Sequence, residues 1–362
     1  MGAGQIFRRT SHAVAPAWRQ SRGRIWLVVV VLAVLVIAIL SVGTGSVAIP
    51  PLTALKILLA RLPFVTLAAD WPASSAAILL DIRLPRVALV ALAGAGLASS
   101  GAAYQGVFRN PLADPYLIGV ASGAGLGAIC AIVLRMRFPG LVGAFGVPLG
   151  AFAGALVTVA LVYVFGRVGR GMPTTTLLLA GVALGTLASA LSTFVLLRAG
   201  QQIGLISAFL LGGYGSAGWE PVLIVAPLVA IGFGTLLLLA RPLNLLLFDE
   251  EQAGQLGVHV ERAKLIAVVA ATLTTAAPVA FSGPIGFVGL IVPHAARLLV
   301  GADHRRLLPL SALGGAGFLM LADLLARTIV APEELPLGVV TAFAGVPFFL
   351  YLLRRAKNAA FF

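Results

Sequence analysis

The sequence has very little charge for its length. Only 10% of its 362 residues are Asp, Glu, Lys or Arg, whereas 60% are hydrophobic, and the mean hydropathy is +1.06. Soluble domains carry about 25% charged residues, so this chain cannot cover a water-facing surface of ordinary size. Most of its outer surface must therefore face lipid, which excludes the class of soluble globular proteins.

Residue types that catalysis and metal binding need are also scarce. Cys130 is the single cysteine, which excludes an intramolecular disulfide and a thiolate cluster. The four histidines lack the spacing of a metal site, and no lysine follows a glycine, so there is no P-loop. We therefore predict no catalytic residue, no metal site and no cofactor. The chain is expected not to be an enzyme and not to hydrolyse ATP by the P-loop route.

Ten apolar segments approach the ~20 residues that a helix needs to span a bilayer. They are Ile25–Val42, Leu84–Gly106, Leu117–Leu134, Val142–Phe165, Thr174–Leu197, Pro221–Ala240, Ala263–Phe281, Ile285–Val300, Leu307–Thr328 and Val339–Leu353. The sequence thus predicts an all-α polytopic membrane protein with about ten transmembrane helices. A cytoplasmic tail over 1–24, a transmembrane domain over 25–355 and a second cytoplasmic tail over 356–362 are the expected divisions.

The distribution of Lys and Arg predicts the orientation. If the N-terminus is cytoplasmic and the spans alternate, 17 of the 25 cationic residues lie inside and eight outside. Because cytoplasmic loops are enriched in Lys and Arg, both termini are expected in the cytoplasm. The same flanking cations explain the net charge of +13 better than nucleic-acid binding does. Ile285–Val300 is the weakest span, and the C-terminal orientation would invert if it did not cross.

Glycines recur at four-residue spacing in three of the apolar segments. The sets are Gly119/Gly123/Gly127, Gly146/Gly150/Gly154 and Gly181/Gly185. Small residues on one helix face let backbones approach closely in lipid, so these sets predict tight helix packing rather than a ligand site.

Three polar features interrupt the apolar pattern. On the inner side, the loop 241–264 carries Asp249, Glu250 and Glu251, which favour the start of a short helix, and Gly257, which would end it. The inner break Arg109–Pro115 contains two prolines that stop the preceding helix, and forms either a gate or a simple tight turn. On the outer side, Arg83, Arg86 and Arg327 lie at span ends, either snorkelling to headgroups or forming a docking surface for an acidic partner.

These residues belong to a longer set of motifs that runs in order from about residue 80 to 355. The set comprises Arg83–Arg86, Ser100–Gln105, Arg109–Pro115, Gly119–Gly123, Leu179–Leu184, Gln255–Gly257, Gly286–Leu290 with Pro293 and His294, Asp303–Arg305, Leu321–Asp323 and Glu334–Thr341. The set resembles the FecCD-type permeases, the membrane subunits of type II ABC importers for iron-siderophores, haem and cobalamin, which include the vitamin B12 importer permease.

The resemblance implies the type II ABC importer permease fold and a set of partners. These are a second copy of the chain or a close paralogue, two cytoplasmic ATPase subunits, an extracytoplasmic substrate-binding protein and membrane lipid, with no nucleic acid. It also implies a multi-pass location in a bacterial or archaeal cell (inner) membrane. The expected cargo is a metal chelate, with iron(III)-siderophore favoured on family breadth and cobalamin or haem as alternatives.

The resemblance also assigns roles to residues. Docking of the binding protein is implied for Arg83, Arg86 and Arg327. A cytoplasmic gate is implied for Asn110, Leu112, Thr174 and Thr175, although the second element reads Pro173-Thr174-Thr175-Thr176 and departs from the family pattern. Coupling to the ATPase is implied for Asp249, Glu250, Glu251, Gln255, Leu256 and Gly257, within Leu247–Val260.

Two other classes of function fit the sequence less well. An ion-coupled secondary transporter usually places carboxylates at mid-membrane, and only Asp323 lies clearly within a span. An intramembrane enzyme needs paired catalytic groups inside the spans, and the sequence offers no such pair. Both classes are therefore less favoured than the importer permease.

Overall fold

The computed structural model describes residues 17–45, 47, 49–61, 70–138, 140, 143–169, 171–198, 203–213 and 218–359. The tail predicted over 1–24 lies outside the described residues up to position 16, as do 360–362 of the tail predicted over 356–362. Within the described ranges the chain is almost entirely helical, and the only β pairing there is an isolated bridge between Val168 and Gly171.

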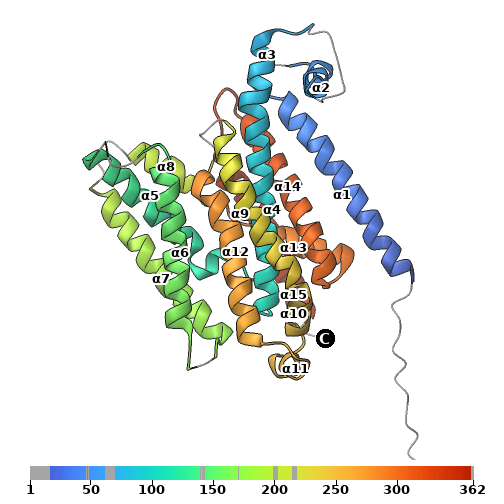
Figure 1. Cartoon of the computed structure of the whole chain (residues 1–362), viewed down its shortest axis with the longest axis vertical. Helices are drawn as coiled ribbons and strands as arrows, with labels where there is room; N and C mark the ends of the chain where they lie inside the picture. Colours follow the sequence, from blue (N-terminus) through green and yellow to red (C-terminus); the bar gives the residue numbers. More distant parts are fainter. Residues whose placement is uncertain are drawn as a thin grey trace, which may run out of the picture.

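Nine long helices form most of the molecule (Figure 1). They are α1 (Ala17–Gly43), α4 (Leu84–Val107), α5 (Val120–Arg137), α6 (Gly146–Gly166), α7 (Thr174–Leu196), α9 (Glu220–Leu238), α12 (Val260–Ser282), α14 (His304–Thr328) and α15 (Leu337–Ala359). Shorter elements are α2 (Pro51–Leu59), α3 (Ala73–Ala77), the π-helix η1 (Ile78–Arg83), the 3₁₀ helix η2 (Pro115–Ile118), α8 (Ile203–Leu211), α10 (Ala240–Leu246), α11 (Glu250–Gln255) and α13 (Val288–Val300).

The number of membrane helices agrees with the sequence. Among the described residues, seven helices are long and apolar enough to cross a bilayer, namely α1, α5, α6, α7, α9, α12 and α14. With α4, α13 and α15 they coincide with the ten predicted segments, so the prediction of an all-helical protein with about ten membrane helices is confirmed.

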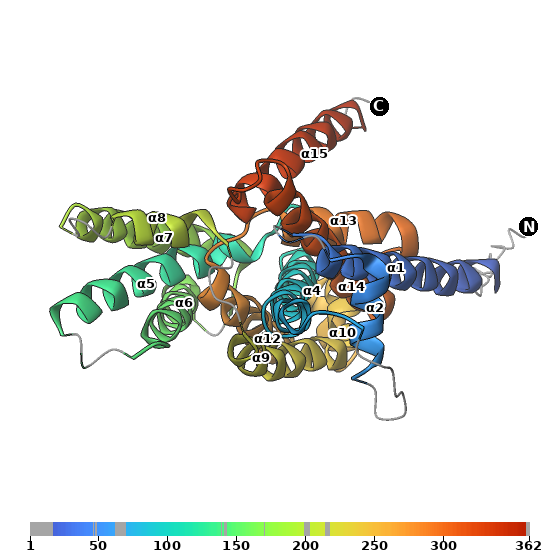
Figure 2. The same cartoon turned by 90° about the horizontal axis from the view of Figure 1, so that it is seen from above.

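Helix α4 is the centre of the bundle, and α9, α12, α13 and α14 pack around it (Figure 2). Every residue from Ser99 to Val107 is buried. The polar side chains on this face are paired across the interface with α12, because Tyr104 Oη lies 3.0 Å from Thr272 Oγ1 and Thr275 Oγ1 lies 2.7 Å from Ser100 Oγ. Hydroxyl pairs therefore add to the apolar packing at the centre of the bundle.

The glycine sets bring helix backbones into direct contact, as predicted. A Cβ on Gly127 of α5 would lie 2.0 Å from the carbonyl oxygen of Gly150 of α6, and one on Gly154 would lie 2.2 Å from the carbonyl oxygen of Gly123. Gly181 of α7 is equally close to the backbone of Leu117, at 2.2 Å. Such distances exclude any side chain, so these glycines are packing residues.

Helix α13 is too short to cross a bilayer alone. Its 13 residues extend about 20 Å, less than the ~30 Å of a hydrocarbon core. It follows α12 through the coil Gly283–Phe287, and the backbone of Gly289 meets α4 at Gly101, within the length of that helix. The chain thus re-enters the bundle part-way and then continues to the α11 end before α14 begins. Consequently α14 runs antiparallel to α4, as the predicted alternation of spans requires.

The connection from α1 to α4 over 46–82 contains α2 and α3, while its positions 46, 48 and 62–69 lie outside the described residues. An ion pair between Lys56 and Asp70 joins its two described parts. The hydrogen bond from Lys56 lowers the pKa of the Asp70 carboxyl.

A prediction follows from the α5–α6 contact. Gly127→Ala should lower the thermal unfolding temperature of the detergent-purified protein, since an inserted methyl group forces the two backbones apart at a cost of about 1–3 kcal/mol. Gly234→Ala in α9 is the matched control, because a Cβ there meets nothing within 4 Å and Ala stabilises a helix by about 0.5–1 kcal/mol over Gly. Equal unfolding temperatures for the two variants would contradict the packing role.

Candidate functional site

The three arginines predicted to dock a binding protein come together at the α3 end of the bundle. Arg83 is buried, and its guanidinium donates to the carbonyl oxygens of Val42 at 3.1 Å, Gly43 at 2.9 Å, and Val47. These acceptors follow α1 or end it, so Arg83 joins the C-terminal end of α1 to the start of α4. All of these hydrogen bonds of the Arg83 guanidinium are to backbone carbonyl groups of the same chain.

Arg86 and Arg327 share one buried carboxylate. Asp323 Oδ1 lies 2.9 Å from Arg86 Nη2, Asp323 Oδ2 lies 2.9 Å from Arg327 Nε, and the Asp323 side chain is 1% exposed. Arg86 has a second partner, Glu334, at 2.8 Å, and that carboxylate is 50% exposed. Arg86, Asp323, Arg327 and Glu334 therefore form one network, which we name the arginine cluster.

The arginine cluster differs from a simple cationic surface. The side chains of Arg86 and Arg327 are only 18% and 7% exposed. An acidic partner could replace the exposed Glu334 on Arg86, whereas Asp323 is inaccessible. Of the three predicted docking residues, Arg86 is thus the one whose ion pair is open to exchange.

The predicted gate residues Asn110 and Leu112 lie in the turn that ends α4 at the opposite end of the bundle. Asn110 N donates to Gln105 O at 3.2 Å and Arg109 N donates to Gly106 O at 3.3 Å, which is the Schellman pattern of a helix C-terminus. Asn110 Oδ1 then accepts the amide of Leu112 at 2.9 Å. The polar residues of the break therefore build a defined turn.

The second predicted gate element begins α7. Pro173 precedes the helix, and the half-buried Thr174 and exposed Thr175 form its first turn. Within the described part of the chain, no hydrogen bond joins these threonines to Asn110 or Leu112. The two elements are connected indirectly, through ion pairs described below.

The predicted coupling segment forms a short helix with one exposed side. The Asp249 carboxylate caps α11 by accepting the amide of Glu250 at 2.8 Å, and Gly257 leaves the segment with φ of +84°, as the acidic start and glycine end of the sequence predicted. Glu251 and Gln255 are exposed, as are the apolar side chains of Phe248, at 77%, and Leu256, at 62%. This end of the bundle therefore presents apolar and acidic side chains. Figure 1 shows α11 at the bottom of the bundle.

Ion pairs and one hydrogen bond connect the predicted coupling segment to both predicted gate elements. Glu250 Oε1 lies 3.0 Å from Arg109 Nη2, and Glu250 Oε2 lies 2.6 Å from Lys264 Nζ. The same Lys264 Nζ donates to the carbonyl oxygen of Met172, two residues before Thr174, at 3.2 Å. Arg109 also lies 3.4 Å from Asp249.

Sequence reasoning missed the roles of Arg109 and Lys264. Lys264 was counted only as a cation that sets topology, and Arg109 as such a cation and as part of the polar break. Lys264 is 1% exposed, and one sequence signal was available, because it falls in the first turn of an otherwise apolar span. Its partner Glu250 is 14 residues away, beyond any local spacing rule.

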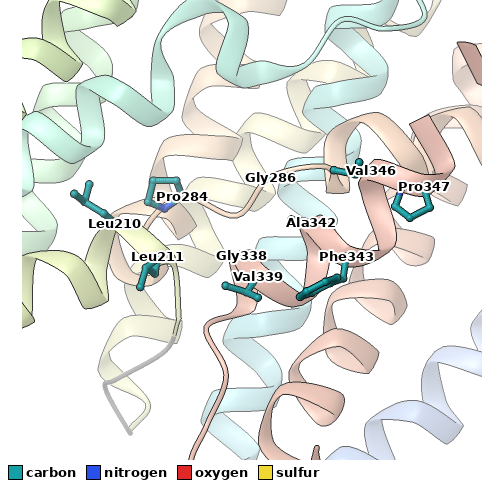
Figure 3. Close-up of a pocket in the computed structure, with 10 residues that line it drawn as sticks. All are labelled: Leu210, Leu211, Pro284, Gly286, Gly338, Val339, Ala342, Phe343, Val346 and Pro347. Atoms are coloured by element: carbon teal, nitrogen blue, oxygen red, sulfur yellow. The ribbon is translucent and has the colours of Figure 1, made fainter. Parts of the chain in front are cut away.

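An apolar groove of about 650 Å³ opens beside α15 (Figure 3). Leu210 and Leu211 of α8 line one side, and Val339 and Phe343 of α15 line the other. Its remaining lining residues are Pro284, Gly286, Gly338, Ala342, Val346 and Pro347. None of these residues is ionisable, and Phe343 is 78% exposed.

Comparison with known proteins gives consistent results. The sequence pattern described as the FecCD transport family matches residues 32–355. The chain is 43% identical to the cobalamin import system permease protein BtuC of Halobacterium salinarum, over 97% of this chain and 100% of that protein. It is 44% identical to the hemin transport system permease protein HmuU of Yersinia pestis, over 77% of this chain and 84% of that protein.

A solved structure supports the same likeness. It is described as an inward-facing conformation of a metal-chelate type ABC transporter and superposes with a TM-score of 0.77. The two chains are 31% identical, and the superposition covers 92% of this chain and 99% of the other.

The arginine cluster generates a stability prediction. Asp323→Asn should destabilise the protein by about 3–5 kcal/mol, because it leaves two half-buried guanidinium groups without their shared carboxylate. Asp81→Asn is the control, since Asp81 is exposed, precedes α4 and forms no ion pair among the described residues. Thermal unfolding in detergent measures both variants, and an Asp323→Asn protein as stable as the control would refute a shared ion pair.

Proposed function

The chain belongs to the FecCD transport family, the membrane permeases of ABC importers for metal chelates, and we propose that its own cargo is an iron(III)-siderophore. The observation that carries the proposal is the family match over residues 32–355, which includes both ends of the bundle. The choice of iron among the chelates rests on the breadth of the family. Cobalamin and haem are the alternatives, each favoured by a relative whose name states that cargo.

Partners are proposed for each surface. A second copy of the chain would cover the apolar groove between α8 and α15, because Phe343 and its neighbours leave that face without a partner within the chain. A cytoplasmic ATPase subunit would bind the exposed side of α11, where Phe248 and Leu256 offer apolar area beside acidic residues. An extracytoplasmic binding protein would dock at the arginine cluster through its own acidic groups.

From the positions of these three surfaces we infer an orientation in the membrane and a transport mechanism. The α11 end faces the cytoplasm together with both termini, and the transmembrane domain spans 25–355 between short tails. The loaded binding protein docks at the arginine cluster, and ATP binding brings the two ATPase subunits together. Movement of α11 then changes the turn at Asn110 and Leu112 and the start of α7 at Thr174 and Thr175. The chelate would pass between the two copies, where the neutral lining of the groove suits a bulky molecule, since fixed charges would hold it in place.

The uptake assay tests the proposed cargo. The chain is reconstituted in proteoliposomes with its own ATPase and binding protein, and uptake of a ferric siderophore, hemin and cobalamin is compared. We expect ATP-dependent uptake of the ferric siderophore that persists when an uncoupler removes the ion gradients. Uptake of hemin or cobalamin in place of the ferric siderophore would show that the proposed cargo is wrong. Uptake that needs no ATPase and stops with the uncoupler would indicate a secondary transporter.

Docking at the arginine cluster gives a second prediction. Glu334→Gln should raise the affinity of the binding protein by about two- to fivefold, because it removes an exposed competitor for Arg86 that is worth up to ~1 kcal/mol. Glu333→Gln makes the same charge change one residue away, where no ion pair forms among the described residues. Surface plasmon resonance at low and high salt measures both. Docking at Arg86 is disproved if the two variants bind equally.

A further inference from the structure

The carboxylate of Glu250 contacts two separate parts of the α11 end and, through Lys264, is linked to a third. Its two oxygens accept from different cations, Arg109 at 3.0 Å and Lys264 at 2.6 Å. Arg109 belongs to the turn that holds Asn110 and Leu112. Lys264 donates in addition to Met172 O at 3.2 Å, in the connection that leads into α7. A single side chain of α11 is therefore linked to both gate elements.

We propose that Glu250, Arg109 and Lys264 form the linkage that transmits movement of α11 to both gate elements together. The inference rests on the proposed function, since it assumes an ATPase that moves α11. It goes further by assigning positioning roles to Arg109 and Lys264. We name these three residues the Glu250 linkage.

The Glu250 linkage has two branches, the pair with Lys264 and the pair with Arg109. The burial of Lys264 constrains the first of them. Its side chain is 2% exposed, and an ammonium group removed from water is strongly destabilised unless it keeps an ionised partner. Glu250 is the only carboxylate paired with Lys264 among the described residues. When α11 moves, Lys264 must follow Glu250 or lose that partner. Because Lys264 also holds Met172 O, the connection into α7 follows as well.

The backbone of Arg109 supports the other branch. Arg109 occupies the C′ position of the Schellman turn with φ of +49°, a left-handed conformation in which glycine is the usual residue. Glycine would satisfy the turn with less backbone strain. The side chain that makes this position costly is the one that reaches Glu250 and Asp249. The geometry therefore favours a role for Arg109 in the ion pairs rather than in the turn.

Exposed apolar side chains next to α11 offer a surface on which a partner could act on the Glu250 linkage. Phe248 and Leu256 are exposed at 77% and 62%, whereas the Glu250 carboxylate on the same segment contacts the bundle. The segment 248–256 thus offers apolar side chains to a partner on either side of α11 and an ionic group to the gate elements. Force applied to the first side reaches the second through six helical residues capped by Asp249.

The test compares substitutions that break each branch. Arg109→Gly keeps the turn and removes the Glu250 branch, Lys264→Met removes the other branch, and Glu250→Gln weakens both. Arg109→Lys restores the charge, and Arg305→Gln is the control, because Arg305 is an exposed cation at the same end with no ion pair among the described residues. Each variant is assembled with the ATPase and the binding protein in proteoliposomes. The cargo is whichever of ferric siderophore, hemin and cobalamin the wild-type complex imports.

The readout is the number of ATP molecules hydrolysed per chelate imported. We expect this ratio to rise by about fivefold or more in Arg109→Gly, Lys264→Met and Glu250→Gln, with partial recovery in Arg109→Lys and no change in Arg305→Gln. A double variant Arg109→Gly/Glu250→Gln should be no worse than Glu250→Gln alone, since the two share one contact. If the three residues only stabilised the structure, the variants would yield less assembled complex but keep the wild-type ratio of ATP to chelate. That result would overturn the proposal.

A second measurement does not depend on the cargo. In a Cys130→Ser background, Leu112→Cys reports the accessibility of the gate turn to a membrane-impermeant maleimide, with and without a non-hydrolysable ATP analogue. We expect the analogue to change labelling in the intact linkage and not in Arg109→Gly, whose exposed glycine-compatible position avoids a folding defect. Equal changes in both would overturn the linkage. Failure of the wild-type complex to import any of the three chelates would instead refute the proposed function.

Discussion

The structure depends on how a chain with so few charges satisfies the ones it buries. At each end of the bundle, one carboxylate lies between two cations. Asp323 accepts from Arg86 and Arg327 at the α3 end, and Glu250 accepts from Arg109 and Lys264 at the α11 end. Because isolated charges are strongly disfavoured away from water, Asp323 must keep its arginines, and the buried Lys264 must keep Glu250.

Helix α4 connects these two ionic sites. It carries Arg86 in its first turn, and Arg109 follows its last residue, with a run of buried small and polar residues between them. Its packing against α12 and α14 relies on paired hydroxyls and on backbone contacts such as Gly94 with Gly315, where a Cβ would lie 2.1 Å from the carbonyl oxygen. A helix held so closely along its length has little freedom to bend, so displacement at one end is carried to the other.

Much of this architecture could be predicted from the sequence because lipid imposes simple rules. Segment length and hydropathy located the ten helices, and glycine spacing predicted tight packing of the kind found between α5 and α6. The acidic start of α11 and the glycine after it were also evident. These features depend on residues close together in the chain, where helix geometry fixes their relation.

The parts that could not be predicted depend on distant residues. Arg86 and Asp323 are 237 positions apart, and nothing local indicates that a predicted docking residue already has a buried partner. Lys264 was assigned to a loop because it lies at the edge of a span, whereas packing against Met172 and Glu250 encloses it. The half-length of α13 was indicated only by a weak span, and its re-entry point needed the fold. Tertiary contact therefore decides which charges are exposed.

The coil that precedes α13 has a consequence for hydration. Helical backbone satisfies its own amides and carbonyls, but Gly283–Phe287 lies within the bundle without that pattern. Tyr116 Oη supplies part of the need, accepting the amide of Ile285 at 2.8 Å and donating to its carbonyl oxygen at 3.0 Å. Irregular backbone at membrane depth persists only where protein encloses it or water reaches it. The groove is lined by Pro284 and Gly286 of this coil, so solvent that enters the groove reaches polar backbone there.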